Sequence, residues 1–435
     1  MGAENAITNF IGNLGPINRL TIEPKKFNGL DEIKSTKFKK LLFEFIEEKK
    51  LLNIIKYNKD IQTKLDINIS KYKEFNEKFT KIELELIPEK NKFGEFINIY
   101  DIDEYYHIYF NNRKRESGRN FIKENEEITK IRIVIDHQVK SLYKLFDNCN
   151  CIKSIKFKRF ARNNINNMSY MFSKCSSLRE LDMDIINTSN VTTMSHMFES
   201  CELLREINVS RFDTINVNDM SFMFNECSSL TKLDVSNFNT SNVYDMGFMF
   251  HCNKGLKELN LSNFDTSKVI NMGYMFRFCS ELNKLNISSF NTNNVTNISW
   301  MFSWCTSLTE LNLSNFNTCN VKDMSGIFDG CEALKDLKIS SFNTNNVTNM
   351  KYMFACCSKL KELNITHFNT NKVSNMFFMF KGCSSLKELD LSNFDISSVN
   401  NMNYMFYKCS KELINNVQQQ NKGIVDEAFA TPDFD

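Results

Sequence analysis

The chain has 435 residues, a formal net charge of +2, 42% hydrophobic residues and 24% charged residues. These values are typical of a globular protein with room for two or three domains. A charge so close to balance argues against the basic surface that binds nucleic acids or acidic membranes, so we expect protein partners and no nucleic acid.

The N-terminus gives no targeting signal. The first twenty residues lack the basic head and unbroken apolar run of a secretory signal. No stretch contains 18 consecutive apolar residues, so we expect no membrane insertion. The sequence therefore predicts a cytoplasmic protein, with the cell surface as the alternative if a signal absent from this chain exports it.

Residues 1–78 are expected to form a small helical N-terminal region. Within it, residues 36–65 carry apolar side chains at helical spacing, which predicts two or three short amphipathic helices. The stretch faintly resembles the F-box, a helical motif that docks repeat-bearing adaptors onto ubiquitin ligases, but the usual Leu-Pro opening is missing. Helices that only form a core are the simpler interpretation.

Residues 79–136 are expected to form a β-rich cap. Ile82, Leu84 and Leu86 alternate with charged residues before a turn that begins at Pro88. Residues 105–110 and 130–136 are two further strand candidates. Since the first coil of a repeat stack needs a cover, we expect this segment to close the repeats that follow.

From residue 137 to residue 413 a pattern of 26 residues recurs about ten times without insertion or deletion. Its marker is a phenylalanine, usually preceded by Met, which recurs from Phe146 to Phe406 and defines position 0 of each coil. Positions 6, 9 and 11 are aliphatic, position 14 is Phe, position 19 is Val, and positions 22 and 25 are Met. An unbroken period of this length predicts a solenoid, in which each coil buries its apolar face on its neighbours.

The two halves of each coil differ in pattern. Residues 256–264 read L-x-x-L-x-L-x-x-F, the strand segment of a leucine-rich repeat. The other half places Val243, Met246 and Phe250 at helical spacing. Strands pack about 4.8 Å apart and helices about 8–10 Å apart, so the stack should bend into an arc with its strands inside. The sequence thus predicts an α/β leucine-rich-repeat solenoid with parallel strands on the concave face, short helices or turns on the convex face, and an α+β N-terminal domain.

Three stretches carry a family resemblance: MSYMFSKCSSLREL at 168–181, LNLSNFNTCNVKDM at 311–324 and MFKGCSSLKELDLSNFD at 379–395. They resemble the BspA-like leucine-rich repeats of bacterial surface antigens, which have relatives among mycoplasma lipoproteins and protist proteins. The resemblance implies a right-handed solenoid that binds proteins or host surfaces. It also implies the alternative of an exported adhesin, although this chain shows no export signal or lipobox.

Fourteen cysteines raise the question of a metal site or disulfides. Ten of them occupy position 3, from Cys149 to Cys409, and only Asn253 interrupts them, with Cys252 one place early. An inward Cys behaves as a small hydrophobe, and the spacings match no paired zinc pattern, so we expect no metal and no cofactor. Unpaired thiols suit a reducing compartment. Glycans on a row of N-x-S/T motifs at strand spacing could not all fit, so either the protein stays inside the cell or its host does not glycosylate such motifs; they begin at Asn208, Asn260, Asn286, Asn312 and Asn364.

Catalytic motifs are lacking as well. The five histidines are scattered, and the sequence contains no phosphate-binding glycine motif and no nucleophile elbow. Carboxylates recur periodically, as surface positions do. We therefore expect no enzyme.

The first candidate site is an acidic strip on the concave face. Positions 8 and 10 point outward from the strands and hold ten acids against three lysines. Such a strip suits a basic segment of a partner, whereas a solvated sheet surface is the simpler interpretation. The candidate residues are Glu258, Glu310, Asp336, Glu362 and Glu388.

The second candidate site is an aromatic patch on the convex face. Position 24 is aromatic in eight of ten coils, and position 2 adds two more aromatic residues. On helices these residues would form exposed i, i+4 pairs, and Gly326 and Gly330 would leave an open shelf beside them. If the half-coil is not a regular helix, the rings would instead stack between coils. The candidate residues are Tyr274, Phe278, Trp300 and Trp304.

Residues 414–435 are polar and are expected to form a C-terminal cap and flexible tail. Together these patterns predict a non-catalytic, intracellular scaffold that binds other proteins. The exported adhesin and the F-box-like adaptor are the alternatives, and neither the partner nor the oligomeric state can be deduced from the sequence.

Overall fold

The computed structural model divides the chain into two compact units, residues 1–76 and 77–435. It describes residues 81–99, 106–135, 139–160, 162–420 and 423–432, all of which belong to the second unit. The helices predicted within 36–65, together with the F-box resemblance, lie outside the described residues.

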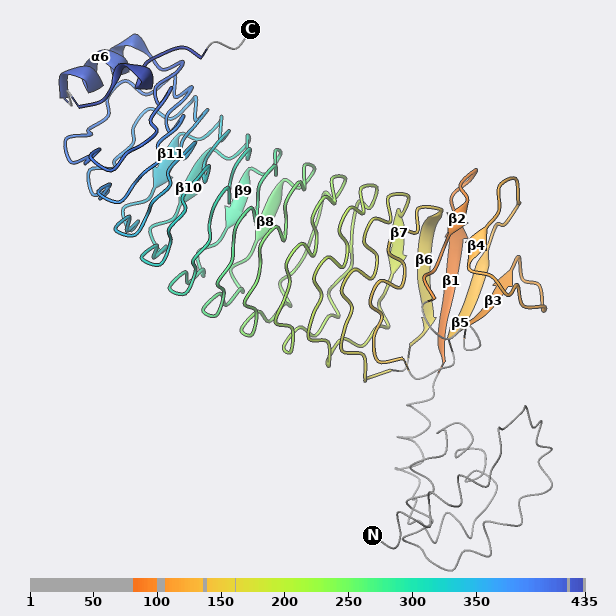
Figure 1. Ribbon diagram of the computed structural model, residues 1–435. Coiled ribbons are helices and arrows are strands. Elements are labelled where there is room, and N and C mark those ends of the chain that lie inside the picture. Colours follow the sequence, from red (N-terminus) through yellow and green to blue (C-terminus); the bar gives the residue numbers. More distant parts are fainter. Residues whose placement is uncertain (1–80, 100–105, 136–138, 161, 421–422, 433–435) are drawn as a thin grey trace, which may run out of the picture. The chain divides into compact units, whose positions relative to one another are not determined.

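An antiparallel sheet begins the described part of the chain (Figure 1). Its central strand β1 pairs antiparallel with β5 on one side and with β6 on the other, while β6 pairs parallel with β7. Ile82, Leu84 and Leu86 of β1 are fully buried, as their alternation predicts. The strand order is β3-β5-β1-β6-β7, with bounds β1 Ile82–Pro88, β3 Tyr106–Phe110, β5 Ile131–Ile135, β6 Ile152–Arg159 and β7 Glu180–Asp182. A small pair, β2 Gly94–Glu95 with β4 Phe121–Ile122, accompanies it.

Because β6 belongs to the first coil, β1 joins the antiparallel sheet directly to the repeats. The 79–136 segment was expected to cover the first coil, and β1 and β5 do so by continuing its sheet. A pairing of this kind leaves no bare edge on β6, which would otherwise attract another chain.

Successive coils pair in parallel at a spacing of 26 residues (Figure 1). One line of pairs runs through positions 8–10, where β8 Glu258–Asn260 pairs with β9 Lys284–Asn286, and β10 Glu310–Asn312 with β11 Asp336–Lys338. A second line consists of single bridges at position 21, from Ser141–Asn167 to Asn375–Asn401. The bridges at position 21 join every pair of neighbouring coils in this range, whereas the pairs at positions 8–10 join alternate neighbours.

The second half of each coil consists of turns, so of the predicted short helices or turns it is the turns that form. In the coil around Phe172 the backbone N–H groups alternate: Tyr170 N–H donates to Ser195 of the next coil at 3.0 Å, while Ser173 N–H turns back to Tyr170 at 3.1 Å. Positions 24 and 2 adopt a left-handed backbone, with φ of 58° at both Tyr170 and Lys174. Consecutive turns place apolar side chains every three residues, so they reproduce the spacing that suggested a helix.

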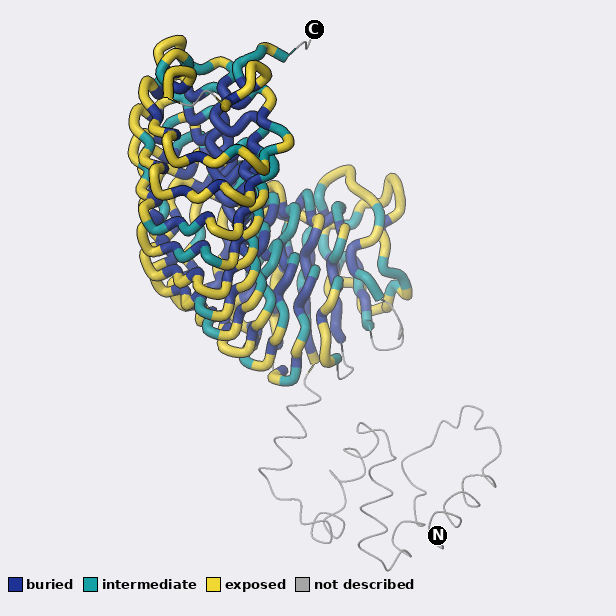
Figure 2. The backbone as a smooth tube through the Cα atoms, turned by 60° about the vertical axis from the view of Figure 1, so that its left-hand side comes forward, coloured by how far each residue is buried: buried dark blue, intermediate teal, exposed yellow. Residues whose placement is uncertain are grey.

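Stacked phenylalanine rings form the centre of the core. From Phe146 to Phe406 the rings at position 0 are fully buried. Their centroids lie 5.5–6.1 Å apart in neighbouring coils, with interplanar angles of at most 18°. Buried methionines at positions 22 and 25 surround them. In Figure 2 the backbone is coloured as buried at recurring places from coil to coil. The buried Met-Phe pairs therefore serve the core, as predicted.

A buried threonine at position 16 ties neighbouring coils together through its hydroxyl. Thr188 Oγ1 donates to the carbonyl oxygen of Asp213 at 2.9 Å and accepts from the N–H of the same residue at 2.7 Å. The donated bond recurs in seven further coils, at Thr214, Thr240, Thr266, Thr292, Thr318, Thr344 and Thr370. These hydroxyls satisfy backbone groups that would otherwise be buried without partners.

The last coil is closed by the chain's own C-terminal segment. The described helices are α6 Lys411–Gln420 and the 3-10 turn η2 Asp426–Ala428, and Leu413 of α6 is fully buried. Phe406 N–H donates to Ala428 O at 2.9 Å, and the ring of Phe429 stacks on Phe406 at 5.4 Å. Residues 426–429 thus occupy the place of a further coil, and the predicted C-terminal cap begins at Lys411 rather than at residue 414.

Candidate interaction surfaces

The strand face presents the five predicted acidic residues to solvent. Glu258, Glu310 and Asp336 lie on β8, β10 and β11. Glu362 and Glu388 occupy the same position in the next two coils, and all five are exposed. Positions 8 and 10 therefore point outward, as the alternation predicts.

Two adjoining hollows lie over this face. The first, of about 460 Å³, extends from Leu233 to Glu310, and the second, of about 400 Å³, extends from Leu285 to Lys338. They share Leu285, Asn286 and Glu310. The shared residues make β8 to β11 one continuous depression lined by amides, carboxylates and partly exposed leucines.

The acidic strip is interrupted by lysines. Lys284 lies 3.9 Å from Glu258, and Lys338 lies 3.7 Å from Asp336, and all four side chains are more than half exposed. Exposed pairs of this kind contribute about 0–1 kcal/mol and are weakened by salt. Glu310, between the two pairs, has no ion-pair partner among the described residues, and the same is true of Asp234 at the edge of the first hollow.

The asparagines of position 10 are fixed in place. Asn260, Asn286 and Asn312 each accept a hydrogen bond at Oδ1 from the N–H two residues ahead, at 3.1–3.2 Å. Ser288 and Ser314 donate their hydroxyls to the same oxygens of Asn286 and Asn312. Because these side chains are already fixed by hydrogen bonds, they lose less conformational entropy on binding a partner than mobile side chains would.

On the turn face the position-24 residues stack between coils. His196 occupies position 24 in the coil between those of Tyr170 and Phe222. Its ring centroid lies 4.2 Å from that of Tyr170 and 4.4 Å from that of Phe222. Further neighbouring pairs have centroids 4.4–6.5 Å apart: Phe222–Phe248, Phe248–Tyr274, Tyr274–Trp300, Tyr352–Phe378 and Phe378–Tyr404. Of the two interpretations, stacking between coils therefore describes this column, and the i, i+4 pairs that helices would have formed are not present in it.

The two tryptophans also fill the predicted open shelf. A Cβ on Gly326 would collide with the indole of Trp300, and a Cβ on Gly330 would lie 2.8 Å from Cδ2 of Trp304. The glycines are buried, and Trp304, 37% exposed, is the most exposed ring of the patch. Phe278 stacks on Trp304 at 6.1 Å. The four candidate aromatic residues thus lie together, but as a closed layer without a shelf.

A cation lies among these rings. The guanidinium carbon of Arg277 is 4.6 Å from the ring centroid of Phe278, 5.0 Å from that of Trp300 and 5.5 Å from that of Tyr274. Three such contacts hold Arg277 by cation–π attraction. The patch is therefore already occupied by a charge of its own chain.

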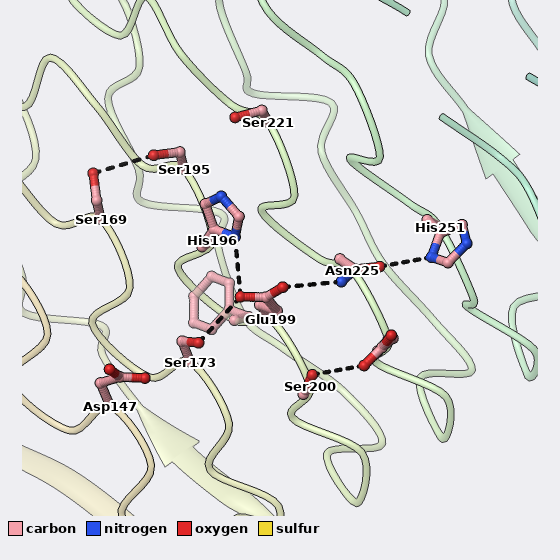
Figure 3. A network of polar contacts seen from close by, with 12 residues as sticks. Asp147, Ser169, Ser173, Ser195, His196, Glu199, Ser200, Ser221, Asn225 and His251 are labelled. Atoms are coloured by element: carbon pink, nitrogen blue, oxygen red, sulfur yellow. Dashed lines mark hydrogen bonds and ion pairs between the residues drawn. The ribbon is translucent and has the colours of Figure 1, made fainter. Parts of the chain in front are cut away.

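A row of polar residues at position 1 underlies the rings, and sequence reasoning missed it. Burial opposes ionisation of Glu199, but hydrogen bonds outweigh it and lower the pKa of this carboxyl. These bonds come from His196 Nδ1 at 2.9 Å, from Ser173 Oγ at 3.2 Å and from Asn225 Nδ2 at 3.2 Å (Figure 3). His251 Nδ1 in turn lies 2.8 Å from Asn225 Oδ1, so one network links four neighbouring coils.

Two titratable groups of this row have strongly shifted pKa values. Burial, assisted by the charge of Arg277, lowers the pKa of His251 to about 4. Burial raises the pKa of Asp329 to about 6, against hydrogen bonds from Trp304 and Ser303. Position 1 has no consensus residue, because its side chain changes from each coil to the next, and so the periodic pattern gave no signal for it.

The cysteine column is structural. From Cys175 onward each column thiol donates to the carbonyl of the position-0 phenylalanine one coil back, as Cys201 does to Phe172 at 3.2 Å. All fourteen cysteines are free, and burial raises the pKa of Cys227 and Cys279 to about 12. Within the described ranges no three His, Cys, Asp or Glu residues are grouped as metal ligands would be.

These features define a repeat protein of stacked 26-residue coils. Residues 140–257, 231–335 and 307–421 match a family described as Mycoplasma protein of unknown function, DUF285. The matches together span about two thirds of the sequence, and the chain belongs to this family. The match agrees with the predicted resemblance to mycoplasma relatives of the BspA-like repeats, whereas nothing in the comparisons supports the F-box resemblance.

Two solved structures are similar to the chain. One is a leucine-rich repeat protein from Bacteroides ovatus, with 17% identity and a TM-score of 0.28, covering 68% of this chain and 86% of that one. The other is the functional domain of InlJ from Listeria monocytogenes, described as including a cysteine ladder, with 17% identity and a TM-score of 0.13, covering 57% and 62%. None of the curated proteins matches the chain. In the part of the chain that the structure describes, no helix has the length and apolar character needed to cross a bilayer.

Proposed function

We propose that the chain is a non-catalytic scaffold that binds another protein through the strand face of β8 to β11. The observation that carries this proposal is the pair of adjoining hollows over these strands. Their lining repeats from coil to coil, so it offers the same amide and carboxylate groups at regular intervals. Extended concave surfaces of this type are what repeat proteins use for binding.

The charges of the hollows favour a partner segment with basic side chains. Asp234, Glu258, Glu310 and Asp336 outnumber Lys284 and Lys338 among the lining residues. An extended segment would meet the fixed amides of Asn286 and Asn312 with its backbone and Glu310 with a Lys or Arg. Complementary charge of this kind contributes mainly to association rate and specificity.

The proposed location is the cytoplasm. The free thiols support it, since a column of donating cysteines is suited to a reducing compartment. An exported adhesin remains the alternative that the family resemblance implies. Isolating the protein from its native cells and assaying glycans and thiol oxidation would separate the two, because an exported form is expected to carry one or the other.

A peptide titration tests the binding proposal. The probe is a fluorescent ten-residue peptide in which Lys or Arg alternates with Ser, and its anisotropy is followed on titration with the full chain. Glu310→Lys is expected to weaken binding several-fold, because it places a like charge at the centre of the hollows. Glu332→Lys changes the net charge equally at an exposed position outside the hollows, and is expected to bind as the unmodified protein does. Equal weakening by both substitutions would mean that only net charge attracts the peptide.

A further inference from the structure

Two exposed phenylalanines flank the small ribbon of β2 and β4. Phe93 directly precedes β2, and its exposure of 59% is the highest of any large hydrophobic residue in the described part of the chain. Phe121 begins β4 and is 39% exposed. The next residue of β4, Ile122, is buried and supplies the contact of this ribbon with the core. Neither phenylalanine is needed there, and exposed aromatic residues of this kind are enriched in protein interfaces.

A hollow of about 690 Å³ lies beside this ribbon and is larger than either hollow of the strand face. Its two walls are residues 87–93, at the end of β1, and residues 122–129, between β4 and β5, and Lys153 of β6 adjoins them. These residues form the cap hollow. Its apolar side chains are those of Ile87, Pro88, Phe93, Ile122 and Ile128. The volume is within the range of about 300–1,000 Å³ that is usual for binding clefts.

Both walls of the cap hollow are held in place by hydrogen bonds. Glu89 N–H donates to Cys151 O of the first coil at 2.8 Å. On the other wall, Asn111 Nδ2 donates to Glu127 O at 2.9 Å, and Asn111 Oδ1 accepts from Thr129 N–H at 2.8 Å. A site whose walls are already fixed loses less conformational entropy when a partner binds.

The rim of the cap hollow has a surplus of positive charge. Two of its glutamates are neutralised within the chain, because Arg179 lies 3.1 Å from Glu89 and Arg119 forms an ion pair with Glu126. The other two carboxylates of the lining are those of Glu124 and Glu127. Against them stand four exposed lysines without an ion-pair partner among the described residues: Lys90, Lys92, Lys123 and Lys153. Such a rim favours a partner of negative charge.

We propose that the cap hollow, together with Phe121, is a second docking surface, which binds a partner segment that carries carboxylates and an aromatic or aliphatic side chain. The apolar side chain of the segment packs on Phe93 between the two walls, and its carboxylates meet the lysines of the rim. A flat anionic bilayer would cover Glu124 and Glu127 together with the lysines and be repelled by them. The hollow therefore favours a narrow peptide segment over a membrane.

This proposal does not depend on the strand face. The cap hollow shares no lining residue with the hollows of β8 to β11, and its preference for charge is the opposite one. A chain with both surfaces holds an acidic segment and a basic segment at the same time. The cap would thus add a second, different partner to a scaffold.

A peptide titration of the full chain tests the apolar part of this surface. The probe is a fluorescent ten-residue peptide of Glu, Phe and Ser, and its anisotropy is followed. Phe93→Ala is expected to weaken binding at least about fivefold, because it removes the exposed ring of the hollow. Ile270→Ala truncates a side chain that is 49% exposed and lies outside the hollow, and should bind as the unmodified protein does. An affinity unchanged by Phe93→Ala, or no binding of the peptide at all, would overturn the proposal.

Two charge reversals test the rim. Lys92→Glu is expected to weaken binding several-fold, because it places a like charge beside the carboxylates of the peptide. Lys254→Glu changes the net charge equally at an exposed position outside the hollow and should leave binding unchanged. Equal weakening by both would mean that only net charge attracts the peptide, and the proposal would fall. If Phe93→Ala proves unstable in thermal unfolding, this comparison still decides.

Two further measurements separate the cap hollow from its alternatives. Glu310→Lys, which is expected to weaken the basic peptide, should not weaken the acidic one, so the failure of either binding proposal is visible without the other. Sedimentation with vesicles of phosphatidylcholine and phosphatidylserine tests a membrane as the partner, and no binding is expected. Vesicle binding that is lost in Phe93→Ala would assign the surface to a membrane and overturn the proposal.

Discussion

Gly330 lies directly beneath the indole of Trp304, so that a Cβ at this glycine would stand 2.8 Å from ring atom Cδ2. Gly330 also has φ of 73°, a backbone conformation that disfavours other residues. A side chain at this position would therefore cost free energy twice, through the clash with Trp304 and through the left-handed backbone. Gly118, which has the left-handed backbone but no close neighbour, allows the two costs to be measured separately.

Gly330→Ala is expected to lower the free energy of unfolding by about 2–4 kcal/mol, from the left-handed backbone and the overpacking together. Gly118 has φ of 65°, but a Cβ there would have no heavy atom within 4 Å. Gly118→Ala should therefore lower the free energy of unfolding by only about 1–2 kcal/mol. Urea denaturation of both variants measures the difference. Equal losses would show that Trp304 moves aside without cost.

The buried threonines predict a second stability difference. Thr266→Val keeps the shape of the side chain and removes the hydroxyl that bonds both the N–H and the carbonyl of Asn291, at 2.8 and 2.9 Å. Leaving these groups without partners is expected to cost about 2–3 kcal/mol. Thr296→Val, at an exposed position, should change stability by less than about 0.5 kcal/mol. A Thr266→Val protein as stable as the Thr296→Val control would show that the hydroxyl column contributes nothing.

The period, the phenylalanine core and the strand segments could be predicted because they recur in every coil. The choice between helices and turns could not be made from the pattern, because Met246, Met249 and Phe250 keep the same spacing in consecutive turns as they would in a helix. One signal was present, since Gly326, Gly330 and Gly382 replace larger residues in columns 24 and 2, where the backbone is left-handed. The network around Glu199 had no such signal, because its members differ from coil to coil and meet only through the fold.

The interrupted cysteine column predicts a gain of stability on repair. Asn253→Cys restores the thiol bond to Phe224 O and removes the buried, unpartnered Oδ1. We expect it to raise the free energy of unfolding by about 1 kcal/mol, and Cys279→Asn to lower it by at least as much. Thermal unfolding of both variants measures the two shifts. A destabilised Asn253→Cys would mean that an unseen partner satisfies Oδ1.

His251 and Asp329 predict opposite dependences of stability on pH in the window between about pH 4 and pH 6. Asp329 has a folded-state pKa of about 6, above its usual value, so the native state binds more protons there and its contribution is lost as the pH rises. His251 has a folded-state pKa of about 4, below its usual value, so its contribution is lost as the pH falls. Each shift corresponds to roughly 3 kcal/mol at most.

The two slopes partly cancel in the unmodified protein, and single substitutions separate them. Asp329→Asn is expected to leave the His251 contribution, so the free energy of unfolding should rise more steeply from pH 4 to pH 6 than in the unmodified chain. His251→Phe should leave only the Asp329 contribution. The free energy of unfolding of this variant should then decrease from pH 4 to pH 6 relative to that of the unmodified chain. Urea midpoints at half-unit pH intervals measure the three profiles. Parallel profiles would show that neither group titrates with a shifted pKa.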